Sequence, residues 1–250
     1  MADRPVALIT GASRGIGAAT ARELARRGYA LALAARSADA LALLAGELAR
    51  AECPALPIPT DLQRPDEVQR LARLALGHFG RVDALVNNAG IGSAGRAFAH
   101  LESEAIQAMI EVNLRAPIAL TRALLPTMLE RRRGAIVFVA SVAGQIGLPG
   151  SAIYSATKFG LRGFALALRR EVTHRGVRVA VVSPGFVATA MTTRLRYVPK
   201  VPPELVARAI ADAIVHPRRE VVVPGYYRLF VWLDRALPGL LDIVLRWRAG

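Results

Sequence analysis

Short apolar segments alternate with longer amphipathic segments along most of this chain, and this alternation restricts the fold more than any other feature. The first four segments are PVALIT, GAATARELARRG, YALALAAR and SADALALLAGELARA. The first and third have the composition of buried strands, whereas the second and fourth place apolar residues at helical spacing. Such alternation is typical of a parallel sheet covered by helices on both faces.

The same alternation continues through the next two thirds of the sequence. It runs through the strand-like DALVNNAG, a helical region from about Glu102 to Arg131, and the strand-like GAIVFVAS. A helical region from about Ser151 to Arg175, the strand-like VRVAVVSPG and a final strand in REVVVPG follow. The whole pattern therefore predicts an α/β fold of the doubly wound type.

No linker rich in Gly, Ser or Pro interrupts this pattern, so we predict one domain over residues 1–225 and an amphipathic tail over residues 226–250. The single cysteine, Cys53, has no partner for an intramolecular disulfide and no clustered His or Cys for a metal site. We therefore expect no metal and a reducing, cytoplasmic location. The start MADRPVALIT lacks the basic and long apolar regions of a signal peptide, and none is expected.

The formal net charge of +14 raises the question of a nucleic-acid partner. The arginines are spread along the helical segments, and we interpret most of them as side chains on solvent-exposed helix faces. The densest basic run, ERRRG, falls where a helix should end, and cations there stabilise the helix dipole. We therefore predict that the chain does not bind nucleic acid.

A glycine-rich loop, TGASRGIG, joins the first predicted strand to the first predicted helix. Gly11, Gly15 and Gly17 would let the backbone approach a pyrophosphate, which the N–H groups of the helix N-terminus would stabilise. Thr10 and Ser13 could add hydrogen bonds. The spacing differs from the common G-x-G-x-x-G, and a tight strand-to-helix turn is the alternative, but the first βα position favours dinucleotide binding.

Two arginines indicate which dinucleotide this loop would take. Arg36 follows the second strand, where a fold that prefers NAD usually carries an acidic residue for the ribose 2′-hydroxyl. Arg14 lies in the glycine loop, so two guanidiniums could meet a 2′-phosphate. The alternative is that both are surface arginines in an arginine-rich chain. Asp39 is better explained as a first-turn acid that favours the helix dipole.

Polar residues also follow the third and fourth predicted strands, in TDL and VNNAG. The carboxyl ends of parallel strands form the edge at which such sheets bind ligands. Asp61 could accept a hydrogen bond from an adenine amino group, and the bend from Asn87 to Gly90 would lie beside the cofactor. Taken singly, each of these segments is better explained as a strand-ending turn, because Asn, Asp and Gly are common turn residues.

Only two of the 33 basic residues are lysines, and one of them, Lys158, lies four residues after Tyr154. This spacing places both side chains on one face of a helix, while the fifth strand brings Ser141 to the same edge of the sheet. An ammonium would favour the phenolate form of the tyrosine, and a compact lysine suits this role better than arginine. Ser141 would hold a substrate oxygen and Tyr154 would transfer its proton without a metal.

With these motifs in order, residues 5 to 225 resemble the short-chain dehydrogenase/reductase (SDR) family. The residues that carry the resemblance are Thr10, Gly11, Gly15, Gly17, Asp61, Asn87, Asn88, Ala89, Gly90, Asn113, Ser141, Tyr154, Lys158, Pro184, Gly185 and Thr189. The resemblance implies a Rossmann-type doubly wound parallel sheet of seven strands in a single domain. Each match is weak alone, but the ordered set is highly specific.

The resemblance also implies roles for individual residues. Asn113 would complete the catalytic set of Ser141, Tyr154 and Lys158 by holding a water for proton relay, and Lys158 would bind the nicotinamide ribose. The residues expected to bind NADP(H) are Thr10, Gly11, Ser13, Arg14, Gly15, Ile16, Gly17, Arg36, Asp61, Leu62, Asn88, Ala89, Gly90, Tyr154, Lys158, Pro184, Gly185, Val187 and Thr189.

The segments expected to border the substrate, VAGQIGLPGSAI and FVATAMTTRLRYV, are rich in apolar residues and contain no acidic one. We therefore predict a small lipophilic carbonyl or alcohol substrate. The alternative is that these side chains pack on each other. The predicted protein is an NADP(H)-dependent oxidoreductase, and we expect a homodimer or homotetramer. The alternatives are a non-catalytic NADP(H) sensor and a peripheral membrane-associated protein.

The tail from residue 226 to 250 places Arg228, Arg235, Asp242 and Arg246 on one stripe of a helix and fills the rest with apolar residues. Charges interrupt the apolar runs, and a Pro-Gly pair breaks the helix, which argues against a transmembrane span. Three alternatives stay open for the tail, namely a lid over the pocket, a subunit contact and a helix on a membrane surface.

Overall fold

The computed structural model describes residues 4–92, 96–193, 199–216, 218–237 and 239. A seven-stranded sheet in the order β3-β2-β1-β4-β5-β6-β7 forms its centre, and every neighbouring pair is parallel. The strands are β1 (Val6–Thr10), β2 (Ala30–Ala35), β3 (Ala55–Pro59), β4 (Ala84–Asn87), β5 (Gly134–Val139), β6 (Val177–Pro184) and β7 (Glu220–Val223). This confirms the predicted doubly wound α/β fold.

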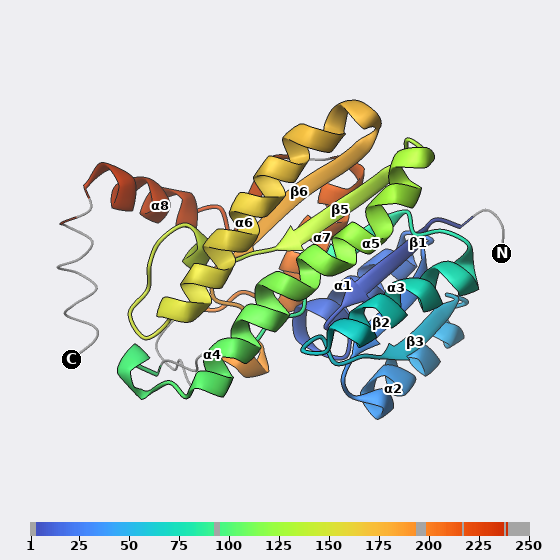
Figure 1. Cartoon of the computed structure of the whole chain (residues 1–250), viewed down its shortest axis with the longest axis horizontal. Coiled ribbons are helices and arrows are strands. Elements are labelled where there is room, and N and C mark those ends of the chain that lie inside the picture. The colour runs from blue at the N-terminus through green and yellow to red at the C-terminus, as the bar shows by residue number, and fades with distance from the viewer. Residues whose placement is uncertain (1–3, 93–95, 194–198, 217, 238, 240–250) are drawn as a thin grey trace.

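Helices cover both faces of the sheet, as Figure 1 shows. The helices on one face are α1 (Gly15–Arg26), α2 (Ala38–Arg50) and α7 (Pro203–Val215). Those on the other are α3 (Pro65–Phe79), α5 (Ala116–Glu130) and α6 (Ala152–Val172). Each set forms a separate apolar core with its face of the sheet, which explains why strands such as β1 and β5 are buried throughout.

Shorter helical segments complete the structure. They are α4 (Ser103–Ile110), α8 (Tyr227–Ala236), a π-helix (Glu111–Arg115) and the 3₁₀ turns Phe98–His100, Val142–Gly144, Thr173–Arg175 and Ala190–Thr192. The helical region predicted near residues 102 to 131 is therefore three consecutive segments with a π-helix between α4 and α5. Such bulges occur often at functional sites, and this one contains Asn113.

The strand order reverses beside β1, since β2 and β3 lie on one side of it and β4 to β7 on the other. Connections that diverge in this way leave a crevice at the carboxyl ends of the two central strands. The residues that follow β1, β2, β4, β5 and β6 therefore meet at one edge of the sheet. The fold brings the glycine loop and the predicted catalytic residues to this edge.

The tail begins with α8, which lies at the end of the molecule opposite the N-terminus in Figure 1. The stripe residues Arg228 and Arg235 are exposed on it, whereas Asp242 and Arg246 lie outside the described residues. Within the described ranges, no helix has the length and apolar character needed to cross a membrane. The domain boundary at residue 225 stays a prediction.

Candidate functional site

The glycine loop packs so tightly that three of its positions need bare backbone. A Cβ at Gly17 would lie 2.0 Å from the carbonyl oxygen of Gly11. Gly11 itself has φ +66°, and a Cβ there would lie 2.9 Å from the Cα of Ala89. Gly15 has φ +55°, in the left-handed region that favours glycine. The loop thus forms a cradle of bare backbone at the start of α1, which fits the pyrophosphate of a dinucleotide.

Thr10 and Asn88 lie at this loop, but most of their polar atoms form hydrogen bonds between the end of β1 and the segment that follows β4. The Thr10 hydroxyl oxygen accepts hydrogen bonds from the backbone N–H groups of Asn88 at 3.0 Å and Ala89 at 3.1 Å. The Asn88 side-chain amide donates to the carbonyl oxygen of Thr10 at 2.8 Å. These bonds tie the end of β1 to the end of β4. In this structure both residues therefore hold the loop in shape.

Arg14 and Arg36 follow β1 and β2, which are neighbours in the sheet, and both are exposed. Neither guanidinium forms a hydrogen bond or ion pair with any residue that the structure describes. Both are thus available to an anionic ligand. Asp61 follows β3, and its carboxylate accepts a hydrogen bond from the backbone N–H of Gln63 at 3.0 Å, which leaves further acceptor capacity.

Ser141, Tyr154 and Lys158 meet at the carboxyl end of β5. The Lys158 side chain is buried, and its Nζ donates to the carbonyl oxygen of Val139 at 2.9 Å. The same Nζ lies 5.8 Å from the centre of the Tyr154 ring. Ser141 hydrogen-bonds the Tyr154 phenol, and its Oγ accepts from the backbone N–H of Ala143 at 3.1 Å. The structure therefore brings together the three residues predicted from their positions in the sequence.

Burial dominates the ionisation of the tyrosine and the lysine. It raises the pKa of Tyr154, and the hydrogen bond with Ser141 lowers it only in part. Burial also lowers the pKa of Lys158 to about 8. The expectation that the Lys158 ammonium brings the Tyr154 pKa down is therefore not met in this structure, because burial is the largest influence on the phenol and raises its pKa.

Asn113 lies in the π-helix and is completely buried. Its Oδ1 accepts from the backbone N–H of Ile91 at 2.8 Å, and its Nδ2 donates to the carbonyl oxygen of Ile91 at 2.8 Å. Nδ2 also donates to the Thr157 hydroxyl at 3.1 Å. A Cβ at Gly90 would lie 3.4 Å from both Asn113 Oδ1 and Lys158 Nζ. Asn113 therefore ties the loop after β4 to α6 beside Lys158.

The segment after β6 closes the site from the other side. The carbonyl oxygen of Pro184 lies 3.4 Å from the Ser141 hydroxyl, which donates to it. A Cβ at Gly15 would lie 3.0 Å from the Thr189 Cγ2, so this segment reaches the glycine loop. Val187 forms an isolated parallel bridge with Val201. The predicted nicotinamide-end residues thus border both the glycine loop and the serine.

Part of the predicted substrate border packs against α8. Val142 and Ile146 form a small buried cluster with Val231 of α8, and Tyr227 packs against this cluster. For Val142 and Ile146 the alternative of mutual packing is therefore the correct one. Met191 remains 48% exposed, and a Cβ at Gly92 would lie 3.6 Å from its sulfur and 3.8 Å from Tyr154 Cδ2. Met191 and Tyr154 thus both lie close to Gly92.

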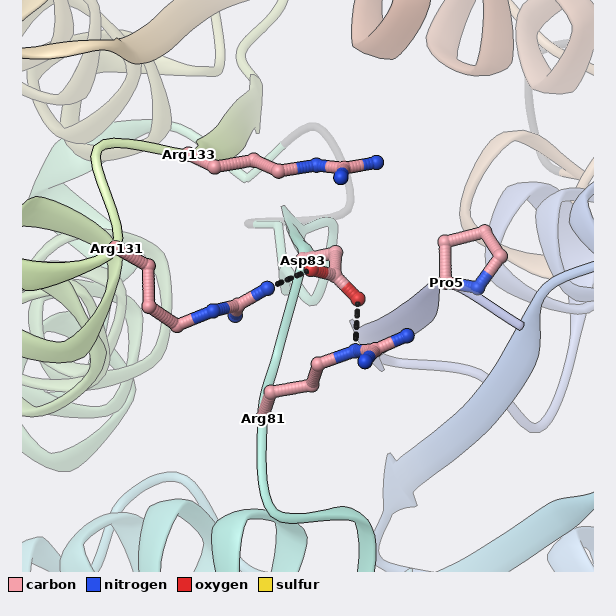
Figure 2. A pocket seen from close by; sticks show the side chains of 5 residues that line it. All are labelled: Pro5, Arg81, Asp83, Arg131 and Arg133. Atoms are coloured by element: carbon pink, nitrogen blue, oxygen red, sulfur yellow. Dashed lines mark hydrogen bonds and ion pairs between the residues drawn. The ribbon is translucent and has the colours of Figure 1, made fainter. Parts of the chain in front are cut away.

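A cavity of about 150 Å³ lies at the opposite, amino edge of the sheet, and Figure 2 shows the side chains around it. Asp83 accepts from Arg81 at 3.0 Å, from Arg131 at 2.7 Å and from the backbone N–H of Val6 at 2.9 Å. Burial alone would raise the pKa of this carboxyl, but its hydrogen bonds and the two arginines hold the pKa below its usual value. This arrangement ties β1, β4 and the end of α5 together.

One polar cluster beside the site has no signature in the sequence. Glu220 at the start of β7 accepts hydrogen bonds from Gln145, Arg162 and Ser183. These four residues come from segments that are far apart in the sequence, and single acids, amides and arginines carry no spacing signal. The one available hint is that Arg162 lies one helical turn after Lys158.

A family model for the short chain dehydrogenases matches residues 5–198. The ketoacyl reductase HetN of Nostoc sp. is 36% identical over 252 residues, covering 96% of this chain and 88% of that protein. The 3-oxoacyl-[acyl-carrier-protein] reductase of Synechocystis sp. is 40% identical over 195 residues, covering 78% of each chain. Sequence relatives thus match the region that holds the glycine loop and the Ser141, Tyr154 and Lys158 cluster.

Solved structures show the same similarity. A metagenomic short-chain oxidoreductase in complex with NADP superposes with a TM-score of 0.78 at 35% identity. The match covers 88% of this chain and 96% of that one.

Proposed function

We propose that this chain, which belongs to the short-chain dehydrogenase family, is an NADP(H)-dependent oxidoreductase that interconverts a lipophilic ketone or aldehyde and its alcohol. The observation that carries this proposal is the meeting of Ser141, Tyr154 and Lys158 at the sheet edge that also holds the glycine cradle. A protein that only sensed the cofactor would not need a proton donor beside it.

The cofactor would supply a hydride to the carbonyl carbon or accept one from the alcohol. In the reducing direction, Ser141 holds the carbonyl oxygen by a hydrogen bond. Tyr154 gives its phenolic proton to that oxygen, since the phenol carries this proton at neutral pH. Lys158 lies beside the ring and stabilises the phenolate that proton transfer leaves. In the oxidising direction Tyr154 removes the proton.

The preference for NADP(H) over NAD(H) rests on Arg14 and Arg36. Both guanidiniums lie at the ends of adjacent strands, and both lack a partner among the described residues. A 2′-phosphate offers the acceptors that a planar guanidinium binds in a bidentate manner. The NADP complex of a relative that superposes on this chain supports the same choice.

The substrate is proposed to be apolar around its carbonyl group. Met191 is an exposed apolar side chain that, like Tyr154, lies within 4 Å of a Cβ placed at Gly92, and the sequences VAGQIGLPGSAI and FVATAMTTRLRYV contain no acidic residue. Two relatives carry the names of a ketoacyl reductase and a 3-oxoacyl-[acyl-carrier-protein] reductase. We therefore include 3-oxoacyl thioesters among the ketones that this site would reduce.

The proposal is tested by following NADPH oxidation with a panel of ketones, aldehydes and 3-oxoacyl thioesters of increasing chain length. We expect turnover with apolar carbonyls and little or none with small charged ones. The Tyr154→Phe variant serves as the control for background oxidation. Absence of turnover across the panel in both directions, in a protein that binds NADPH, would instead support a sensor.

A further inference from the structure

The carboxylate of Glu220 joins three segments of the site. Gln145 Nε2 donates to Glu220 Oε1 at 2.8 Å, and Ser183 Oγ donates to the same oxygen at 2.9 Å. Arg162 binds in a bidentate manner, with Nε 3.0 Å from both carboxylate oxygens and Nη2 2.8 Å from Oε2. One side chain on the edge strand β7 thus receives bonds from α6, from β6 and from the loop after β5.

Each of these donors lies close in sequence to a residue of the proposed machinery. Gln145 comes four residues after Ser141, and Arg162 comes one helical turn after Lys158 on the same face of α6. Ser183 directly precedes Pro184, which begins the segment at the nicotinamide end. The cluster therefore connects the serine loop, the tyrosine and lysine helix and the cofactor-side segment through one carboxylate.

The loop that carries Ser141 also rests directly on α6. A Cβ at Gly144 would lie only 2.7 Å from the carbonyl oxygen of Lys158, so the loop backbone touches the helix backbone at the lysine. This contact sets the height of the loop above α6. The Ser141 hydrogen bond to Pro184 and the packing of Val142 and Ile146 also hold this loop. The charge-assisted bonds around Glu220 add a directional restraint between the loop and α6.

The cluster is poorly explained by stability alone. The Arg162 and Glu220 side chains are 19% and 14% exposed, and Ser183 is completely buried. Desolvation of two charges consumes much of their attraction, so apolar residues of similar size often stabilise a fold equally well. A buried ion pair with two further hydrogen bonds is better suited to fixing one geometry.

We propose that Glu220, Arg162 and Gln145 are positioning residues that hold Ser141 in register with Tyr154. This rests on the proposed function, in which Ser141 binds the substrate oxygen and Tyr154 delivers the proton. A shift of about 1 Å between such groups can cost on the order of a hundredfold in rate. Loss of the cluster therefore lowers the rate of the chemical step while the glycine loop still binds the cofactor.

The decisive variant is Gln145→Met, which has a similar size and removes only the link between the serine loop and Glu220. Glu220 keeps Arg162 and Ser183, so no buried charge is left without a partner. The double variant Arg162→Met/Glu220→Leu removes the whole centre of the cluster and leaves no lone charge. Glu47→Gln is the matched control, because Arg22 and Glu47 form an exposed bidentate pair at 2.7 and 2.8 Å elsewhere, between α1 and α2.

For each folded variant we measure kcat and KM for a carbonyl substrate, the NADPH dissociation constant, and hydrogen exchange of backbone amides in residues 141–150. We expect kcat to fall at least fivefold in Gln145→Met and further in the double variant. NADPH affinity should stay within threefold, and exchange in this segment should rise. Glu47→Gln should match the parent in all three measurements.

A folded Gln145→Met variant whose kcat falls less than fivefold overturns the proposal. So does a kcat loss that is matched by an equal loss of NADPH affinity, since that would indicate general loosening. If the double variant does not fold, Gln145→Met decides alone. If the parent shows no turnover, the proposed function has failed, and unchanged hydrogen exchange in Gln145→Met would separately show that Glu220 does not restrain the loop.

Discussion

The aromatic ring of Tyr227 lies directly against the backbone of Gly185. A Cβ at position 185 would lie 2.1 Å from Cε2 of that ring. Phe186 and Phe230 pack around the same ring, with centroid distances of 6.4 and 6.0 Å. The first turn of the tail is therefore in contact with the segment proposed to border the nicotinamide.

Gly185→Ala tests this contact. The added methyl group must displace the Tyr227 ring, and overpacking of this kind costs about 1–3 kcal/mol of unfolding free energy. We expect a lower melting temperature and reduced turnover. The Gly185→Ala/Tyr227→Ala double variant should recover part of both losses. Gly225→Ala is the control, because a Cβ there would meet no atom within 4 Å. A double variant no better than Gly185→Ala would argue against the contact.

Tyr154→Phe should abolish most turnover and leave NADPH binding intact. The change removes the proposed proton donor and little else, and general acid catalysis contributes ~10²–10⁴-fold. We expect kcat to fall by at least a hundredfold, with an NADPH dissociation constant within threefold of the parent. Tyr29→Phe removes a hydroxyl from a tyrosine at the opposite, amino edge of the sheet, directly before β2, and serves as the control. Turnover within tenfold of the parent would contradict the role of Tyr154.

Replacing both Arg14 and Arg36 by serine should abolish the preference for NADPH over NADH. Each charge-assisted hydrogen bond to the 2′-phosphate is worth about 1.5–3 kcal/mol before solvent losses. We therefore expect NADPH affinity to fall by at least tenfold and NADH affinity to change little. Arg73→Ser, at an exposed position on α3, controls for the loss of positive charge. Equal affinity of the parent for both cofactors would refute this assignment.

Lys158 should make the stability of the protein depend on pH in the alkaline range. Its pKa is about 8 in the folded protein, and an unperturbed lysine has a pKa of about 10.4. Between these values the unfolded chain binds the proton and the folded protein does not, so stability rises with pH. The full cost of burying the charge, on the order of 3 kcal/mol, applies below about pH 8.

This effect is measured as the difference in unfolding free energy between the parent and Lys158→Met. We expect the difference to change by about 2–3 kcal/mol in favour of the parent between pH 8 and pH 10. Only one other lysine, Lys200, occurs in the chain, and the subtraction removes its contribution. A difference that stays constant over this range would show that the Lys158 pKa is unperturbed.

Truncation after Gly225 should leave NADPH binding intact and change the handling of lipophilic substrates. Val231 is buried against the serine loop, whereas Trp232, Leu229 and Phe230 are 61%, 58% and 44% exposed. Removing α8 exposes the part of the serine loop that packs against Val231, and it also removes the exposed side chains of Trp232, Leu229 and Phe230. Activity across chain lengths tests for a lid, sedimentation for a subunit contact, and flotation with anionic liposomes for membrane contact. No change in any of them would show that the tail has none of these roles.

The parts of the site that could be predicted from sequence are those fixed by local position. Ser141 follows a strand, and Tyr154 and Lys158 share a helix face, so strand and helix geometry alone brings them together. Asn113 acquired a role only through the family resemblance, because an asparagine within a helical pattern carries no spacing signal. Its environment depends on a π-helix, and the periodicity of the sequence does not indicate one.

Other features depend on tertiary contacts between distant segments. Thr10 and Asn88 were predicted as cofactor residues, but their hydrogen bonds join two strands that lie about 78 positions apart in sequence. The cluster around Glu220 draws one donor each from a loop, a helix and a strand. The pKa of Tyr154 was expected to follow charge, yet burial determines it. Burial of this kind is a property of the packed protein and cannot be read from spacing.

The bridge between Val187 and Val201 has a consequence for how this scaffold can change. The Ala188 N–H donates to the Val201 carbonyl oxygen at 2.9 Å, and the Val201 N–H donates to the Phe186 carbonyl oxygen at 3.0 Å, so the two ends of the intervening segment are joined to each other. Lengthening a segment with fixed ends is cheap, since each doubling costs only about 0.6 kcal/mol in closure entropy. Insertions between these two anchors could therefore alter substrate range while the sheet and its cofactor loop stay unchanged, which makes this segment the natural place for directed evolution.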